Sequence, residues 1–463
     1  MEAADRIVNV DTTQTRSRTM KLGLTHWDGD DNVKDGFVLY SSIYPEDPNH
    51  NYVRILNMEG KQVHQWDMGT KRPGLWSYMP EPRCVSKYTT SSSGDKGFIL
   101  AMTKLPENEI HEHHDFIAWM QDSGGCIQLI DWNGNIIWTY KDEYQHHDAR
   151  LTREGNLVYI ANEVLKNKKE AKEIINLAAS HRGFPKKLPF YPSVYVDVIK
   201  MVNPVNGELL FEWHAAQHLD PQIDVLNYND PLDEWNHGNT VVPLYENKND
   251  SSKLTHLLVS FRQISTIVKI DVSNGNFERI LKMPFVSQQH DCSSIEEGNT
   301  NRILVFDNRY IPNDFAPSAF SRVVEYDLTE KEPCPFLPLV MGPKIRWMYV
   351  DGVCDLFSAY ISGAQRLSHF TLEKHGIQYT LITEGMKGRI FIVKTVIEKN
   401  PKETDTPRLL NSIIWEYMNP EIAPGDARKT VLGRSSIFRS RYYTQDYFSS
   451  SQLNEMKTPS SRL

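Results

Sequence analysis

The sequence predicts an all-β fold, a single six-bladed β-propeller with a short helical insertion between blades. Two kinds of strand-and-turn unit alternate along the chain about six times, and the copies of the first unit start roughly 55–75 residues apart. Aromatic residues make up 11% of the chain, with ten Trp and twenty-one Tyr, which favours β structure. Short antiparallel strands repeated at a blade-like period are typical of radial β architectures.

The first unit is a β-hairpin in which a strand ends near an Asn-Gly or similar turn and the next strand often ends in Trp. Apolar residues that alternate on both sides of such a turn predict a hairpin. The copies are residues 53–66, 126–138, 198–213 and 266–280, a weaker copy at 322–333, and the pair 389–395 and 412–417.

The second unit begins with a polar residue, often His, followed by a strand, a Gly-containing turn and another apolar strand. The copies are residues 147–163, 237–262, 290–308 and 366–385, and the weakest is 83–102. The two units together give four strands, which is one propeller blade. A two-sheet sandwich is the alternative, but it would not require the same residue class at the same position of each unit.

These repeats place the propeller at residues 36–447, after an N-terminal segment 1–35 and before a flexible tail 448–463. Residues 163–192 interrupt the pattern with apolar residues at helical spacing, so we expect a helical lid or flank inserted between blades. The stretch 437–447 is expected to be ordered and to close the ring.

Composition excludes several classes of protein. A net charge of −8 disfavours a nucleic-acid-binding face, and no apolar run approaches the ~18 residues of a membrane helix. The N-terminus lacks the apolar core of a secretory signal, and five cysteines without a CxxC pair fit a reducing compartment. We therefore expect no nucleic-acid or membrane partner and a location in the cytoplasm or peroxisome, with no secretion.

The chain ends in Ser461, Arg462 and Leu463, a conservative variant of the Ser-Lys-Leu peroxisomal address. The polar residues before it predict an exposed tail that a peroxisomal import receptor could read. A chance ending on a flexible tail is the alternative interpretation.

Three histidines carry the candidate site: His147, His237 and His290 each begin the second unit. Equivalent positions of successive blades are related by rotation about the axis, so the three imidazoles are expected to converge on one mouth of the channel. His146 is the second choice beside His147. The cluster within HEHHDF at 111–116 lacks the phase of the repeat and is expected to be a solvated loop.

Arg262 ends the strand that follows His237, where other copies have Glu163 and Asn308. A guanidinium there favours transfer of an anionic group, because its planar fork matches the oxygens of sulfate or phosphate. Asp148 and Asp291 directly follow two of the histidines. Since adjacent strand residues point to opposite faces, we expect these carboxylates to bond the backbone or neighbouring blades.

Four segments resemble the arylsulfotransferases that work without the adenylylated sulfate donor. They are HHDARLT, EWNHGNTV, LVSFRQISTIVKID and QQHDCSSI with ILVFDN, and FRSRYY resembles that family's closing blade. The resemblance implies sulfuryl transfer from an aryl sulfate ester to a phenolic acceptor, by ping-pong chemistry through a sulfohistidine and without a cofactor. It implies that His290 is the nucleophile and that His147, His237 and Arg262 line the pocket. An imidazole near its unperturbed pKa of about 6.5 is a competent nucleophile at pH 7.

Two alternatives remain open. Three neutral histidines on an axis could hold a transition metal, with His147, His237 and His290 as ligands, although Arg262 beside a divalent metal would be unfavourable. A non-catalytic binding propeller is the other alternative, since fold does not imply function.

Overall fold

The computed structural model of the chain describes most of its residues. The described ranges are 21–47, 49–70, 73–89, 96–110, 124–182, 194–227, 230–245, 253–296, 299–310, 320–334, 337–351, 355–367, 376–398, 408–422 and 435–457. The histidine cluster at 111–114 and the tripeptide 461–463 lie outside these ranges, so the interpretations given to them remain predictions.

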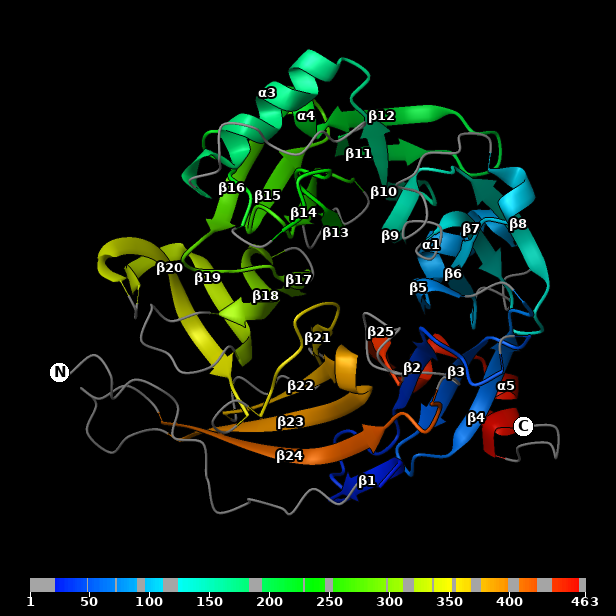
Figure 1. Cartoon of the computed structure of the whole chain (residues 1–463). Helices are drawn as coiled ribbons and strands as arrows, with labels where there is room; N and C mark the ends of the chain where they lie inside the picture. Colours follow the sequence, from blue (N-terminus) through cyan, green and yellow to red (C-terminus); the bar gives the residue numbers. More distant parts are fainter. Residues whose placement is uncertain are drawn as a thin grey trace.

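Within the described residues, the strands form six antiparallel sheets arranged radially around one axis, as Figure 1 shows. This confirms the predicted six-bladed propeller. The sheets are, from inner to outer strand, β25 (Ile437–Tyr443), β2 (Phe37–Ser42), β3 (Tyr52–Asn57) and β4 (Gln62–Asp67); β5 (Pro73–Tyr78), β6 (Ile99–Lys104), β7 (Gly125–Ile130) and β8 (Ile136–Lys141); β9 (Gln145–Leu151), β10 (Leu157–Val164), β11 (Tyr195–Val202) and β12 (Leu209–His214); β13 (Gly238–Leu244), β14 (His256–Phe261), β15 (Thr266–Asp271) and β16 (Phe277–Lys282); β17 (His290–Glu296), β18 (Asn299–Tyr310), β19 (Phe320–Cys334) and β20 (Leu337–Tyr349); β21 (Gly363–Arg366), β22 (Ile377–Glu384), β23 (Arg389–Glu398), β24 (Arg408–Met418) and β1 (Gly23–Trp27).

The ring is closed by pairing the two ends of the chain. β25, near the C-terminus, pairs antiparallel with β2, near the N-terminus, with Phe37 opposite Tyr443. The predicted order and closing role of this stretch are therefore confirmed. Closure matters because an open propeller would expose unpaired strand edges.

The Trp that ends the outer strand of several repeats has a shared role between blades. Trp66 Nε1 donates to the Asp131 carbonyl (2.8 Å), Trp213 Nε1 to that of Gly275 (3.1 Å), and Trp415 Nε1 to that of Met58 (2.8 Å). Each acceptor lies in or beside the outer-hairpin turn of the next blade around the ring. A buried indole that must satisfy its N–H thus fixes the position of each neighbour.

The helical insertion supports the segment that leads to His237. Helix α3 (Lys168–Ala178) begins at Asn167, whose side chain accepts hydrogen bonds from the main-chain N–H groups of residues 169 and 170. Its apolar face joins the buried cluster that contains Trp235, and the Ala178 carbonyl accepts from the Leu226 N–H (3.0 Å). The predicted helix is present, and it acts as a buttress at the rim of the ring (Figure 1).

Two copies of the repeat differ from the prediction. Residues 322–333 were expected to be a hairpin, but they lie within the single strand β19. The register shifts between Asp327 and Lys331, so the sequence DLTE, which lacks Gly, forms an irregularity in the ladder and no turn. In residues 83–102, the expected first strand is replaced by helix α1 (Pro82–Val85), and the inner strand β5 comes earlier.

The ordered fold also extends beyond the expected limits of 36 and 447. β1 lies in the segment placed before the propeller, yet it pairs with β24 as a fifth strand. Helix α5 (Ser450–Lys457) lies in the expected flexible tail, where Met456 is buried and Glu455 accepts a hydrogen bond from Trp132 Nε1 (2.9 Å). Other short helices are α4 (Ala215–His218) and 3₁₀ turns. In the described part of the chain, no helix is long and apolar enough to cross a membrane.

Arg439 of β25 lies at the axis, is fully buried and binds three other blades. Its guanidinium pairs with Asp148 of β9 (3.3 Å) and Asp291 of β17 (3.5 Å). It also donates to the Asn239 carbonyl (2.5 Å) and to Thr240 Oγ1 (2.8 Å), both in β13. Burial disfavours the charged carboxyl of Asp291, but Arg441 and Arg439 overcome this and lower its pKa to about 2. Buried ion pairs thus join the inner strands of these blades.

We expect Arg439→Met to destabilise the protein by about 3–5 kcal/mol, because it leaves two buried carboxylates without their shared cation. The measurement is the free energy of unfolding in denaturant at pH 7. Lys344→Met is the control, since Lys344 pairs with Glu330 at the surface and its loss should cost less than ~1 kcal/mol. Equal costs for the two variants would contradict the role given to Arg439.

Candidate active site

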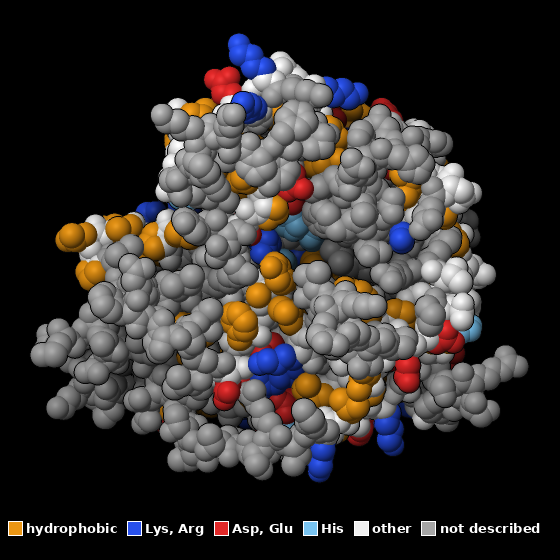
Figure 2. Space-filling view, viewed as in Figure 1, with side chains coloured by type: hydrophobic (Ala, Val, Ile, Leu, Met, Phe, Trp, Pro, Cys, Tyr) orange, Lys and Arg blue, Asp and Glu red, His pale blue; other side chains and the backbone are white. Residues whose placement is uncertain are grey.

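The predicted site residues lie at one mouth of the channel, where the inner strands β9, β13 and β17 begin. His147 lies in β9, His237 directly precedes β13, and His290 begins β17. All three are nearly buried, with exposed fractions of 6%, 9% and 2%. Figure 2 shows histidine side chains at the bottom of a hollow on the axis, with Lys or Arg atoms beside them.

Backbone bulges turn these residues toward the channel. His147 and His237 have φ values of 53° and 54°, in the left-handed region that non-Gly residues rarely adopt. In the blade that begins with β17, the left-handed residue beside the histidine is Asp291 (φ 51°) and not His290 itself. The common phase inferred from the sequence therefore holds at the level of the strand, with a one-residue difference in the bulge that carries His290.

The structure brings His147 and His237 into ring contact and places His290 beside them across Phe438. The His147 and His237 ring centroids are 4.5 Å apart. Phe438 of the closing strand contacts His147 at 6.0 Å and His290 at 6.2 Å, centroid to centroid. The site is therefore assembled from four blades.

His290 is held by Asn308, one strand away in the same blade. His290 Nδ1 lies 2.8 Å from Asn308 Oδ1, and Asn308 Nδ2 donates to the carbonyls of Ser358 (2.8 Å) and Ile361 (2.7 Å). These two donations fix the amide so that its oxygen faces the imidazole, and an oxygen can only accept. The His290 proton must then lie on Nδ1, which leaves the lone pair on Nε2.

His147 is the end of a chain of hydrogen bonds. His146 Nε2 lies 3.0 Å from Asp197 Oδ1, and His146 Nδ1 lies 2.7 Å from His147 Nδ1. A carboxylate accepts from Nε2–H, so a neutral His146 accepts at Nδ1 from His147. Asp197 also accepts from the main-chain N–H of Gly238. His146, the second choice from the sequence, thus orients the ring of His147.

His237 forms a pair with the buried Glu234. His237 Nδ1 lies 2.7 Å from Glu234 Oε2, which also accepts from Gln263 Nε2 (2.8 Å). Burial raises the pKa of Glu234 well above its ordinary range, and Asp197 adds to this. Burial, together with the charge of Arg262, lowers the pKa of His237 to about 3. The uncharged pair is favoured, with the carboxylic acid donating to Nδ1 and the ring proton on Nε2.

Arg262 brings positive charge to the same mouth. Its side chain is 5% exposed and pairs with Asp230 at 3.4 Å, and its Nη2 donates to Gln288 Oε1 at 3.4 Å. The guanidinium carbon lies 4.8 Å from the centre of the Tyr360 ring. These distances are long for charged hydrogen bonds.

Burial keeps the imidazoles uncharged. It lowers the pKa of His290 well below the usual value, and Arg262 lowers it further. It likewise lowers the pKa of His147, to which His237 also contributes. The pKa of His290 therefore lies below that of an unperturbed imidazole, because a dry site beside a cation disfavours imidazolium.

The hydrogen-bond and ion-pair partners of the four candidate residues were not predicted from the sequence. Asp148 and Asp291 do bind neighbouring blades as expected, accepting from the N–H groups of Val241 and Ala364 (3.0 Å each). Glu234 stands three residues before His237, a local signal that could have been noticed, whereas Asp197, Asp230 and Asn308 come from other strands or loops. In the described part of the chain, no group of three or more His, Cys, Asp or Glu is arranged to hold a metal ion.

We expect His147, His237 and His290 to remain neutral at pH 5, where an unperturbed imidazole is ~97% protonated. Because their folded pKa values are lower than the unfolded value, the unfolded state binds more protons below pH ~6.5. Stability should therefore fall as pH decreases from 6.5 toward the folded values. Histidine ¹⁵N NMR and melting temperatures between pH 7 and 4.5 measure both effects. Three signals titrating near 6.5 would contradict this.

Comparison with known proteins adds a family. The family model described as Arylsulfotransferase (ASST) matches residues 114–338. No curated protein sequence matches the chain. Among solved structures, the chain is similar to the Cps50 (Swd1) propeller of Myceliophteria thermophila, with 10% identity, TM-score 0.37, and 83% of this chain and 88% of that chain covered. The Dos1 propeller is 9% identical with a TM-score of 0.34, and the match covers 89% of this chain and 78% of that chain. Hsv2 of Kluyveromyces lactis is 9% identical with a TM-score of 0.33, and the match covers 81% of this chain and 98% of that chain. No conclusion rests on these weak structural likenesses.

The matched residues contain His147, His237, Arg262 and His290, together with their partners Asp197, Glu234 and Asn308. This part of the chain, just under half of its length, is thus similar to the arylsulfotransferase family.

Proposed function

We propose that this protein transfers a sulfuryl group from an aryl sulfate ester to a phenolic acceptor, with His290 as the nucleophile. The match of residues 114–338 to the family model described as Arylsulfotransferase (ASST) supports aryl sulfotransfer. The observation that carries the role of His290 is its bond to Asn308, which leaves a neutral imidazole with its lone pair on Nε2. A neutral nitrogen nucleophile held in one tautomer needs no base to activate it.

In the first half-reaction, the Nε2 lone pair of His290 attacks the ester sulfur, and the bond from sulfur to the aryl oxygen breaks. The phenolate leaves with that electron pair. The ring keeps its proton on Nδ1, so the intermediate is an imidazolium that bears an SO₃⁻ group and is neutral overall. Asn308 Oδ1 faces the Nδ1–H and stabilises the positive ring.

The pair Glu234 and His237 supplies the proton that the departing phenolate needs. Nε2–H of His237 donates to the phenolate oxygen while the acid proton of Glu234 moves to Nδ1. The result is a phenol, a neutral His237 with its proton on Nδ1, and a Glu234 carboxylate. The acceptor phenol reverses the transfer in the second half-reaction, when its oxygen takes the sulfuryl group. The same pair therefore acts first as acid and then as base.

Arg262 is proposed to hold the sulfuryl oxygens. Its main-chain N–H donates to the His237 carbonyl (3.0 Å), and its Nη2 donates to Gln288, two residues before His290 (3.4 Å). The planar fork of a guanidinium fits two oxygens of a sulfate. His147, in ring contact with His237, is proposed to line the same pocket and to help position the aryl oxygen.

We expect His290→Ala to abolish turnover and the release of phenol from an aryl sulfate. Intact-mass spectrometry of the wild type after incubation with the donor should show one added sulfuryl group, absent in the variant. His147→Ala should slow the reaction by about 10²–10⁴-fold while the label stays detectable. A labelled His290→Ala protein, or an unlabelled wild type that still turns over, would contradict the proposal.

We expect Glu234→Gln to slow phenol release strongly only when the leaving phenol is a weak acid. The amide can still bond to His237 but has no proton to pass on. For phenyl sulfate the rate should fall by about 10²–10⁴-fold, whereas for 4-nitrophenyl sulfate, whose phenolate leaves without a proton, it should change little. Single-turnover rates across a series of leaving groups measure this. An equal loss for all leaving groups would assign Glu234 a structural role.

A further inference from the structure

The described residues contain a second cavity, at the mouth of the channel opposite the histidines. Its volume is about 710 Å³, and it is lined by the ends of the inner strands, including Tyr78, Leu151, Ser294, Gln365 and Tyr443. The histidines lie where these strands begin, and Arg439 with Asp148 and Asp291 occupies the axis between the two mouths. The mechanism proposed above does not use this cavity.

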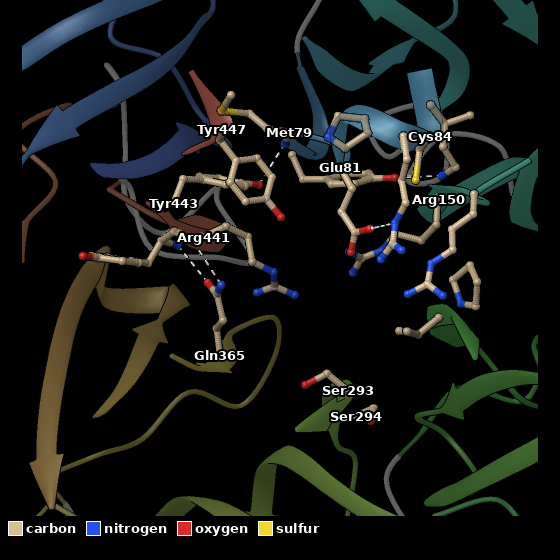
Figure 3. Close-up of a pocket in the computed structure, with 18 of the residues that line it drawn as sticks. Met79, Glu81, Cys84, Arg150, Ser293, Ser294, Gln365, Arg441, Tyr443 and Tyr447 are labelled. Carbon is tan, nitrogen blue, oxygen red and sulfur yellow. Dashed lines mark hydrogen bonds and ion pairs between the residues drawn. The ribbon is translucent and has the colours of Figure 1, made fainter. Parts of the chain in front are cut away.

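Five arginines line the cavity, against two carboxylates, Glu81 and Asp446. Arg366 and Arg441 bind carboxylates of the layer below, Glu325 at 2.6 Å and Asp291 at 2.5 Å. Figure 3 shows Arg150 and Arg441 on opposite sides of the open space, with Ser293 and Ser294 on a third side. The chain as a whole has a net charge of −8, so this cationic lining is a local feature.

Arg150 presents its terminal fork to the cavity. Its Nε donates to Asp148 Oδ1 (3.2 Å), and its guanidinium stacks 4.3 Å from the Trp76 ring centre and 4.9 Å from that of Tyr78. Among the described residues, no hydrogen bond involves its two terminal nitrogens. Stacking on two rings holds the plane of the fork, which is the arrangement that binds an oxyanion through two parallel N–H groups.

Arg153 and Arg83 add positive charge at the rim. Arg153 stacks 3.9 Å from the centre of the Tyr245 ring, and its pKa is lowered by burial and then by the charge of Arg83. Arg83 Nε donates to Glu81 at 2.5 Å. The charge of Glu81 acts in the opposite direction on the pKa of Arg153.

Three phenols complete the lining with oriented donors. The hydroxyl oxygens of Tyr78, Tyr245 and Tyr443 accept from the main-chain N–H groups of Leu151 (2.8 Å), Arg153 (2.7 Å) and Met79 (2.8 Å). Burial raises the pKa of all three, and that of Tyr443 to about 12, so their O–H groups keep their protons. No acceptor for these O–H groups is found among the described residues, and an oxyanion would supply one.

We propose that this cavity binds a small organic molecule that carries an oxyanion group, a carboxylate, sulfonate or phosphonate, with Arg150 as its bidentate partner and Arg153 beside it. The cavity is larger than an inorganic anion needs and falls in the size range of sites for small organic ligands. Leu151, Val242 and Pro243 provide apolar wall for the organic body. This inference does not depend on the proposed sulfuryl transfer.

The test is isothermal titration calorimetry of the full chain with benzoate, benzenesulfonate and phenylphosphonate, which share one body and differ in the anionic group. Benzamide is the uncharged control, and all titrations use a matched low ionic strength. We expect at least one anion to bind with a stoichiometry near one, and Arg150→Gln to weaken it by about 10–100-fold. Arg150→Lys should also weaken it, because a point charge lacks the fork. The strongest of the three anions identifies the group.

Controls separate this cavity from the histidine mouth and from misfolding. Arg262→Gln at the other mouth, and Arg279→Gln, which removes an ion pair with Asp224 outside the cavity, should leave binding unchanged. Arg153→Gln is the second test, because Arg150 also contacts the buried Asp148 and its loss could harm folding. The proposal is overturned if no anion binds more tightly than benzamide, or if Arg262→Gln abolishes binding while Arg150→Gln and Arg153→Gln do not.

Discussion

The buried guanidinium of Arg439 is the interaction on which the rest of the structure depends. It is the contact that joins the closing strand β25 to β9, β13 and β17 at the axis. A cation without water is tolerated only when its charge is neutralised, and Asp148 and Asp291 supply that neutralisation. The same carboxylates hold the next blade through the main-chain N–H groups of Val241 and Ala364. The two carboxylates that neutralise Arg439 at the axis therefore also hold neighbouring blades together.

Desolvation then determines the chemistry at the histidine mouth. In water, three imidazoles near an arginine would share protons according to pH. In this dry site each ring is neutral and has its tautomer chosen by a neighbour: Asn308 for His290, His146 with Asp197 for His147, and Glu234 for His237. Three rings of one residue type thereby differ in role, since one presents a lone pair while another presents a proton. The differences come from second partners and not from the histidines themselves.

The sequence made the blades predictable because the repeat carries physical requirements of a propeller. In three blades the hairpin Trp bonds the next blade through Nε1. In three blades a left-handed residue lies near the start of the inner strand, shifted by one position in β17. The errors occur where local patterns and the ring disagree. DLTE at 327–330 has turn-like composition but forms an irregularity inside β19, and the five-residue β1 is too short to be recognised without its partner β24.

For the site, periodicity found His147, His237 and His290, but their partners required the fold. Asn308 ends the same copy of the repeat that His290 begins, but its position does not reveal the hydrogen bond between them. Asp230 is distant in sequence from Arg262, and no period connects the two. The direction of the pKa shifts was equally beyond the sequence, because it comes from burial that only the closed ring produces. What the sequence could place was the strand on which each histidine lies.

The closing strand makes the site a property of the whole ring. Phe438 lies between His147 and His290, while the next residue, Arg439, binds the aspartates that follow those same two histidines. β25 comes from the C-terminal end of the chain and pairs with the N-terminal β2, so the environment of the histidines depends on both ends of the chain. A site built from three consecutive blades thus also requires a fourth blade, the one that closes the ring.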